Sequence, residues 1–214
     1  MMKIGYFIVF LISIATFGQK KVSFERFSSV LAGIKPNEAI NFWSLHLVDG
    51  NSDKVLLENG EKVGTEKQKS GFLADSTRNT FYYICYQKGN KLTYVTTNDT
   101  LKQFISKTDN AEEAMVLAVL QGYYFDEEYK QFAGNYYEDS QNYYLDLAKI
   151  TSENCPLAKS FFMITVDKKS GNTISVKDNG VYTEVYSKEC KNNPKNPPVQ
   201  IKKQEEKPKK KTYF

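Results

Sequence analysis

The sequence contains a single histidine, and this limits the catalytic chemistry that the chain can carry. Nucleophilic catalysis by a Ser–His–Asp or Cys–His set would have to use His46, whose neighbours include Ser44 and Asp49. No nucleophile signature accompanies them, and a lone histidine is more often a surface or hydrogen-bonded residue. A metal site built on several histidines is excluded by the count, and no glycine pattern that cradles phosphate is present. We therefore assign no catalytic, metal-binding or cofactor-binding residue and expect no cofactor.

Carboxylates offer another route to catalysis. They gather in a tyrosine-rich part of the chain, at Asp126, Glu127 and Glu128 and again at Glu138 and Asp139. Glycoside hydrolysis uses two carboxylates about 5–9.5 Å apart, a distance that spacing along the chain does not determine. A carboxylate-dependent hydrolase acting on an envelope or extracellular polymer is therefore the alternative hypothesis for function, and solvated surface charge is the simpler interpretation.

Tyrosines between positions 123 and 144 form the candidate binding surface. In each doublet on a strand, one ring should face the core and the other the solvent. Exposed rings beside acids suit a saccharide or a protein partner, whereas simple filling of a sheet surface is the alternative. The candidate binding residues are Tyr123, Tyr124, Tyr136, Tyr137, Tyr143 and Tyr144.

The three cysteines predict one disulfide and one buried thiol. Cys85 alternates with aromatic residues inside a predicted strand, which indicates a small buried side chain. Cys155 lies in a loop and Cys190 follows the last predicted strand, so we predict a Cys155–Cys190 disulfide that closes the last β unit in an oxidising compartment. The chain has no C-x-x-C spacing, so a redox enzyme is not expected.

The first eighteen residues have the parts of a secretory signal peptide. A positive charge at Lys3 precedes an apolar run over 4–17, and Gly18 supplies a small residue at the cut. The run is shorter than the roughly 20 residues that a membrane-spanning helix needs. We expect cleavage near Gly18, no transmembrane segment afterwards, and a periplasmic or extracellular protein.

The segment 191–214 has a composition of its own. It holds eight lysines, four prolines and two glutamates, so it buries too little apolar surface to offset the entropy of ordering, and we expect it to be disordered. The net charge of this segment is +6, whereas that of the whole chain is +4, so the rest of the chain carries a net charge near −2. An anionic polymer is the partner that such a tail would bind, and a solubilising tail without a partner is the alternative. Nucleic acid is not expected, because the protein is exported and the basic stretch lacks interleaved aromatic residues.

The elements that must position these side chains begin with a short helix around 23–32. Two hairpins follow. The spacing over 42–48 suits either a helix or a strand, and the turn signals around 55–57 favour a hairpin of 42–48 with 55–57; the second hairpin runs from 80–87 to 91–97. A longer helix over 111–121 begins with a capping-box pattern and is apolar on most sides, so it should be buried against a sheet.

Further strands should follow this helix. A one- or two-turn helix is expected through Phe125, Tyr129 and Phe132, followed by a strand at 143–147. Strands at 160–167 and 173–176 are joined by a strong turn signal, and 181–186 adds a last strand. The predicted fold is α+β, a single domain over 19–190 with central helices packed on antiparallel β hairpins and a meander.

Several stretches between about Thr80 and Val176 carry a resemblance. They are FYYICYQKGNKLTYVTT, LKQFISKTDNAEEAMVLAVLQGYYFD, the Cys155-Pro156 step and FFMITVDKKSGNTISV. This part of the chain, less than half of it, resembles a group of uncharacterised secreted bacterial proteins. The helix and the meander ending in VDKKSG are also similar to a PepSY-type module, a small secreted domain linked to protease inhibition or regulation. The resemblance transfers no active-site residue. Together with the absence of catalytic-histidine, metal and nucleotide patterns, the PepSY-like half favours an exported, non-enzymatic binding or accessory protein of the cell envelope, whose partner is an envelope protein or, through the basic tail, an anionic polymer. A purely structural or colonisation-related surface protein is the third hypothesis.

Overall fold

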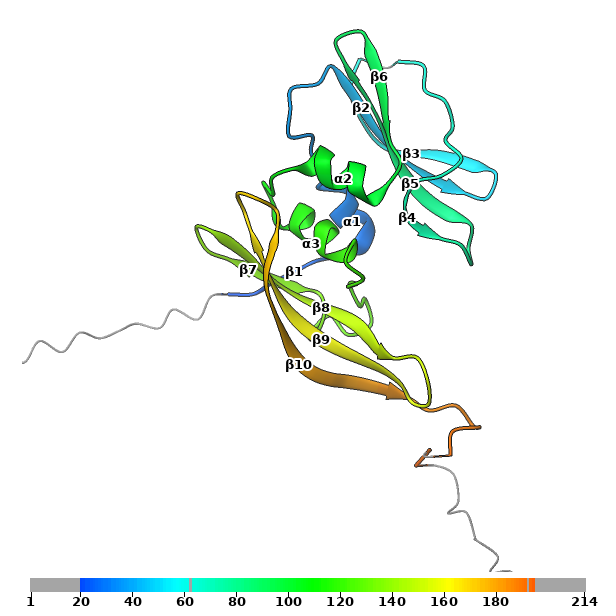
Figure 1. The fold of residues 1–214 in the computed structure, drawn as a ribbon, viewed down its shortest axis with the longest axis vertical. Coiled ribbons are helices and arrows are strands. Elements are labelled where there is room, and N and C mark those ends of the chain that lie inside the picture. Colours follow the sequence, from blue (N-terminus) through cyan, green and yellow to red (C-terminus); the bar gives the residue numbers. More distant parts are fainter. Residues whose placement is uncertain (1–19, 62, 192, 195–214) are drawn as a thin grey trace, which may run out of the picture.

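The structure, a computed structural model, describes residues 20–61, 63–191 and 193–194 (Figure 1). The expected signal peptide at 1–18 and nearly all of the expected disordered tail at 191–214 lie outside the described residues. Strands make up 45% of the structure and helices 13%, in two antiparallel sheets with three short helices in the described part of the chain. The predicted α+β fold, with helices packed on hairpins, is therefore wrong, because the strands pair into extended sheets that dominate the structure.

Sheet A contains the second half of the chain and one short N-terminal strand. β8 and β9 are its central strands, and their apolar residues alternate between a face toward the helices and an outer face. Long antiparallel pairing runs from β8 through β9 to β10, the edge strand. Its strands in spatial order are β1 (Val22–Ser23), β7 (Asn135–Glu138), β8 (Asn142–Ser152), β9 (Leu157–Asp167) and β10 (Thr173–Val185).

Sheet B is built around two neighbouring strands that are paired on both sides. β2 lies between β3 and β5, while β4 and β6 pair with opposite ends of β5. The predicted hairpins at 42–57 and 80–97 are confirmed as β2–β3 and β5–β6. The strands are β2 (Phe42–Asp49), β3 (Ser52–Gly60), β4 (Phe72–Asp75), β5 (Thr80–Lys88) and β6 (Lys91–Val95).

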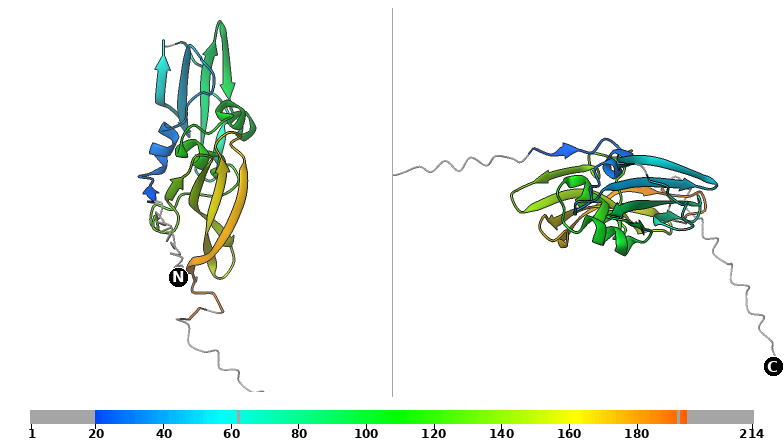
Figure 2. Two further views of the ribbon diagram at one scale, coloured as in Figure 1. Left: turned by 90° about the vertical axis from the view of Figure 1, so that its left-hand side faces the viewer. Right: turned by 90° about the horizontal axis from the view of Figure 1, so that it is seen from above.

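The three helices lie between the two sheets along the long axis of the molecule (Figures 1 and 2). They are α1 (Phe27–Ala32), α2 (Asn98–Ile105) and α3 (Ala111–Val119). The predicted burial of the 111–121 helix is confirmed by α3, whose residues are nearly all buried. The Asn110 side chain accepts a hydrogen bond from Glu113 N–H at 2.8 Å and so caps its first turn.

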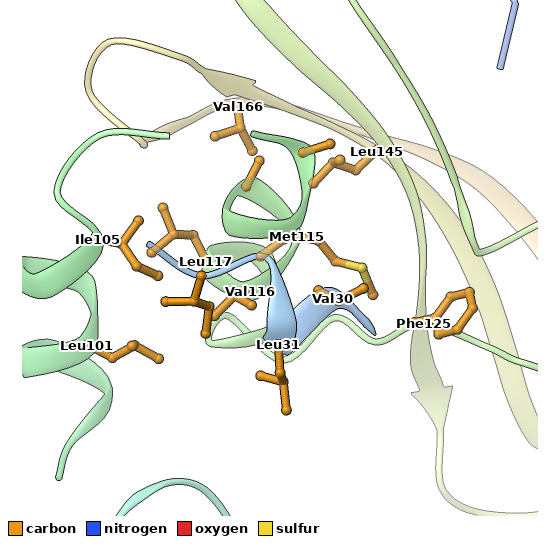
Figure 3. Packing of buried hydrophobic residues seen from close by; sticks show 14 of the residues in the cluster. Val30, Leu31, Leu101, Ile105, Met115, Val116, Leu117, Phe125, Leu145 and Val166 are labelled. Carbon is orange, nitrogen blue, oxygen red and sulfur yellow. The ribbon is translucent and has the colours of Figure 1, made fainter. Parts of the chain in front are cut away.

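One apolar core extends from sheet A through the helices to sheet B. Figure 3 shows Leu31 of α1, Ile105 of α2 and Met115 of α3 converging, with Leu145 and Val166 of sheet A nearby. Side chains of sheet B close the same cluster on the other side, among them Trp43, Leu45 and Ile84. The helices therefore hold the two sheets together through shared burial of apolar surface.

Two predicted elements differ from the structure. The helix expected at 125–132 is absent, because Asp126 closes a loop instead: its N–H donates to Ala133 O at 2.9 Å and its side chain accepts from Glu128 N–H at 3.1 Å. The strands expected at 173–176 and 181–186 are one strand, β10, in which the register shifts between Asp178 and Val181 absorb the apparent turn.

The predicted disulfide is confirmed. Cys155, in the turn after β8, is bonded to Cys190, beyond the end of β10, and their Cα atoms are 5.5 Å apart. Cys85 is a free, fully buried thiol in β5, as predicted. Among the described residues no helix is long and apolar enough to cross a membrane.

Candidate functional site

A cleft of about 300 Å³ opens beside α2, at the lower end of the size range of ligand pockets. Three segments that lie far apart in the sequence form its walls: residues 36–40 before β2, the β5–β6 hairpin, and the C-terminal half of α2. We call it the α2 cleft. Its lining includes the side chains of Asn37, Tyr86, Thr93, Gln103, Phe104 and Ser106.

Aromatic rings form the floor of the α2 cleft. Alternation along β5 directs Tyr86 to the same side of sheet B as the buried Ile84, toward α2. The Tyr86 and Phe104 ring centroids lie 5.4 Å apart at an interplanar angle of 48°. Behind them Trp43 of β2, the only tryptophan of the chain, has its ring centroid 6.3 Å from that of Phe104.

Polar side chains without protein partners form the rim. Within the described residues, no hydrogen bond engages the side chains of Asn37, Thr93, Gln103 and Ser106 or the hydroxyl of Tyr86. These groups can each donate and accept a hydrogen bond. The α2 cleft therefore combines ring faces with hydrogen-bonding groups that a ligand can reach, the usual composition of a ligand site.

The wall formed by residues 36–40 is held in place at both of its ends. Asn37 N–H donates to Phe104 O at 3.5 Å, and Asn41 N–H donates to Gln87 O at 3.0 Å. The Asn41 side chain also accepts from Gly89 N–H at 2.9 Å. This wall is therefore fixed relative to both α2 and the hairpin.

Ser106 ends α2 in a strained conformation and lines the α2 cleft. Its φ of 55° and ψ of −57°, with Lys107 N–H bonded to Ile105 O at 2.7 Å, define a tight γ-turn that is rare for a residue with a side chain. Such conformations cost about 1–3 kcal/mol and cluster at functional sites. The surrounding structure therefore holds the backbone of Ser106 in this conformation despite its energetic cost.

His46 lies in a hydrogen-bond network on the opposite side of sheet B from the helices. Its Nε2 is 2.9 Å from Ser44 Oγ, and its Nδ1 is 3.1 Å from Asp53 Oδ1 and 2.9 Å from the Tyr83 hydroxyl. Because Tyr83 donates to Asp53 Oδ2 at 2.7 Å, Nδ1 carries the proton and Nε2 accepts from Ser44. These are the contacts of a Ser–His–Asp set.

Burial makes this network structural. Ser44 and His46 are 1% and 2% exposed. Their strand pairs with β3 on one side and with β5 on the other, so the network lies inside sheet B. Burial and the bond to Asp53 raise the pKa of Tyr83, which keeps its proton. The acid of the network is Asp53, not the predicted neighbour Asp49.

The two groups of candidate carboxylates lie far apart in the structure. Asp126 contacts Lys159 Nζ at 2.9 Å, whereas Glu138 contacts Lys168 Nζ at 2.6 Å. At about 3.3 Å per residue, the strand from Lys159 to Asp167 alone spans roughly 26 Å, far beyond the separation that glycoside hydrolysis uses.

The other candidate carboxylates also have separate environments. Glu127 accepts from Phe27 N–H at 3.2 Å, and Glu128 is exposed. Asp139 accepts from Gln141 N–H at 2.8 Å and from Tyr144 at 2.8 Å; these bonds, that from Gln141 first, lower its pKa. Among the described residues no group of three or more His, Cys, Asp and Glu residues is placed to hold a metal ion.

The six candidate tyrosines do not share one surface. Tyr143 is buried at 4% exposure, and Tyr136 packs on Phe24 with ring centroids 4.8 Å apart. Tyr137 and Tyr144 stack on each other on the outer face of sheet A, with centroids 4.5 Å apart.

The first doublet of the six is divided in the same way. Tyr123 packs edge-on against Phe162, which contacts the core. The Tyr124 ring lies under Lys159 Nζ, and its hydroxyl is shielded from solvent without a hydrogen bond of good geometry. In each doublet one ring therefore faces the core and the other lies on the outer face. Of the six candidate tyrosines, only Tyr137 and Tyr144 lie together on that outer face, and Tyr124 lies apart from them.

Comparison of the chain with family models, with curated proteins and with solved structures finds no match. The resemblance to secreted bacterial proteins and to a PepSY-type module stays a prediction. Sequence reasoning missed the α2 cleft, because the signals that predict the 80–97 hairpin do not show which other segments meet it in space.

Proposed function

We propose that this protein is an exported, non-enzymatic binding protein of the cell envelope that holds its ligand in the α2 cleft. One observation carries the proposal: an open cleft with an aromatic floor and a rim of polar side chains that make no hydrogen bond with the part of the chain that the structure describes. The walls are fixed by backbone hydrogen bonds, so the site is formed before a ligand arrives, which reduces the entropy cost of binding.

Export is supported by the sequence of residues 1–18 and is compatible with the Cys155–Cys190 disulfide, since disulfides persist in oxidising compartments. N-terminal sequencing of protein recovered from expressing cells should begin at or near Gln19. Recovery of protein that still begins at Met1 would contradict export with cleavage.

Co-sedimentation with isolated cell envelopes tests binding. Gln103→Ala removes an exposed amide from the rim of the α2 cleft, and we expect it to reduce the amount of bound protein. Gln141→Ala is the matched control, because Gln141 is also an exposed glutamine, and its side chain has no hydrogen bond in the described structure. If both variants bind like the wild type, the α2 cleft is not the envelope-binding site.

The tail at 191–214 supplies a second proposed attachment, to an anionic polymer, through its net charge of +6. Removing residues 195–214 should lower co-sedimentation at low salt but leave the effect of Gln103→Ala unchanged. Equal binding with and without the tail at low salt would instead favour a solubilising role.

A further inference from the structure

The α2 cleft is electrically neutral. Glu38 is the one residue of its lining with a side chain that is charged at neutral pH, and its carboxylate is paired with Lys88. A charged ligand would lose its hydration on entering without gaining an opposite charge. The ligand that this site favours is therefore uncharged.

The rim matches the hydrogen-bonding character of hydroxyl groups. Each hydroxyl of a sugar donates one hydrogen bond and accepts others, and the side chains of Asn37, Thr93, Gln103 and Ser106 have the same dual capacity. The half-buried rings of Tyr86 and Phe104 are inclined at 48° to each other, which offers apolar surface in two directions beside these groups. A pyranose has the matching pair of properties: an apolar C–H face and a polar edge.

A peptide fits less well. Extended peptides are recognised chiefly through backbone hydrogen bonds, and the backbone groups at both ends of the 36–40 wall are already paired, Asn37 with Phe104 and Asn41 with Gln87. Proline-rich peptides dock on aromatic grooves, but they require few donors and acceptors, and so they would leave the polar rim unused.

We propose that the α2 cleft binds a short stretch of an uncharged glycan, with a pyranose ring against Tyr86 and Phe104 and its hydroxyls bonded to Asn37, Thr93 and Gln103. This inference rests on the proposed function and names the chemical class of its ligand. Ser106 belongs to the same rim, so its strained γ-turn acquires a role in presenting a hydroxyl to the glycan.

Trp43 provides a built-in reporter. It is the only tryptophan of the chain and its ring lies 6.3 Å from Phe104, while its own exposure is only 7%. The probes are cellotetraose, chitotetraose and maltotetraose, with tetragalacturonate as the charged comparison. We expect at least one uncharged probe to change the Trp43 fluorescence in a saturable way, with matching heat in calorimetry, and tetragalacturonate to bind at least tenfold more weakly.

Side-chain variants locate the binding. Because one hydrogen bond contributes about 1–1.5 kcal/mol, Asn37→Ala and Gln103→Ala should each weaken binding by roughly tenfold. Tyr86→Phe keeps the ring and should weaken binding by less than Tyr86→Ala. Gln141→Ala should bind like the wild type, and circular dichroism with thermal melting checks that every variant is folded.

Two results would overturn the glycan assignment directly: no response to any uncharged probe, or equal affinity in wild type and Gln103→Ala. A further arm separates this failure from failure of the proposed function. Envelope extract that changes Trp43 fluorescence is treated either with periodate, which cleaves vicinal diols, or with protease. Loss with periodate alone supports a glycan; loss with protease alone overturns the glycan but keeps a binding function, and an inert extract overturns both.

Discussion

The thiol of Cys85 lies in the middle of β5, opposite Ser44 in the register of β2 and β5. Burial raises the pKa of this thiol to about 11, although a hydrogen bond with Tyr94 acts in the opposite direction. At pH 8 about one molecule in a thousand therefore carries the thiolate that reacts with disulfide reagents. We expect native protein to resist a chromogenic disulfide reagent at pH 8, and unfolded, non-reduced protein to release one equivalent.

Two outcomes would contradict this pair of assignments. Rapid labelling of the native protein would show that Cys85 is accessible. Three equivalents in the unfolded, non-reduced protein would show that Cys155 and Cys190 are not bonded.

Asp126 gives the stability a defined dependence on pH. Burial raises the pKa of its carboxyl, but hydrogen bonds from Tyr182 (2.6 Å) and Lys159 (2.9 Å) outweigh this, so the pKa lies below its usual value of 3.8. A lowered folded-state pKa stabilises the fold above the unfolded value, and this contribution is lost as the pH falls through the folded value. Asp126→Asn should therefore lower the free energy of unfolding by about 2–4 kcal/mol at pH 7, and by less at pH 3.

Urea unfolding of wild type and Asp126→Asn at the two pH values measures this difference. Glu128→Gln, an exposed neighbour in the same loop, is the control and should have little effect at either pH. An equal difference between wild type and Asp126→Asn at pH 7 and pH 3 would show that the charge of Asp126 is not what stabilises the loop.

At the residue scale the sequence predicted what depends on local alternation. The burial of Cys85 and the pairing of Cys155 with Cys190 followed from position within or beyond a strand. The hydrogen-bond partners of His46 could not be predicted from position along the chain, because Tyr83 and Asp53 reach it from two neighbouring strands. The β2–β3 register places Asp53, rather than Asp49, beside it.

At the element scale, hairpins were predictable and strand continuity was not. β5 and β6 are joined by a short turn, so composition alone identifies both strands. In β10 the stretch Asp178-Asn179-Gly180 has turn composition, yet Gly180 adopts a φ of 95° inside a continuous strand whose register against β9 shifts there. The short strands β4 and β7 were missed because they are defined by their partners, β5 and β8, more than by their own residues.

The cap of α3 is the element-scale feature most open to test. Asn110 accepts from Glu113 N–H and also donates to Gly33 O at 2.9 Å, which ties α3 to the end of α1. Asn110→Ala removes both bonds and should cost about 2 kcal/mol, whereas Asn110→Asp keeps the cap and should cost about half as much. Thermal melting of the two variants measures the order; equal losses would mean that the cap contributes nothing, and no loss in Asn110→Asp would mean that the bond to Gly33 contributes nothing.

At the scale of the whole molecule, what the sequence does not show is which hairpins share a sheet. β2 pairs with β5 and β1 pairs with β7. These pairings join segments that lie far apart in the sequence, so the periodicity of hydrophobic residues within each segment does not reveal them. The α2 cleft arises from the same non-local assembly, since Asn37, Tyr86 and Gln103 meet only after sheet B has docked on α2. This is why the candidate site chosen from the tyrosine-rich segment and the site found in the structure are in different places.

The Cys155–Cys190 bridge is the long-range covalent constraint on this assembly. It closes a sequence separation of 35 residues, for which the loop-entropy model gives about 3–4 kcal/mol of stabilisation. Replacing both cysteines by serine should therefore lower the melting temperature by roughly 10 °C at 2–4 °C per kcal/mol. Calorimetry under oxidising conditions measures the change, and reduction of the wild type should reproduce it; an unchanged melting temperature in both cases would mean that the bridge does not stabilise the fold.

The same bridge also determines how the protein carries a mechanical load. A pull between the N-terminal side of β8 and the chain beyond Cys190 passes from β8 to Cys155, across the sulfur atoms, and out again. β9 and β10 lie inside the closed covalent loop, so tension cannot peel β10 from the edge of sheet A one hydrogen bond at a time. If the protein were held to a surface through its C-terminal end, a pulling force would bypass the β9–β10 hairpin. Only reduction of the disulfide would transmit that force through the hairpin.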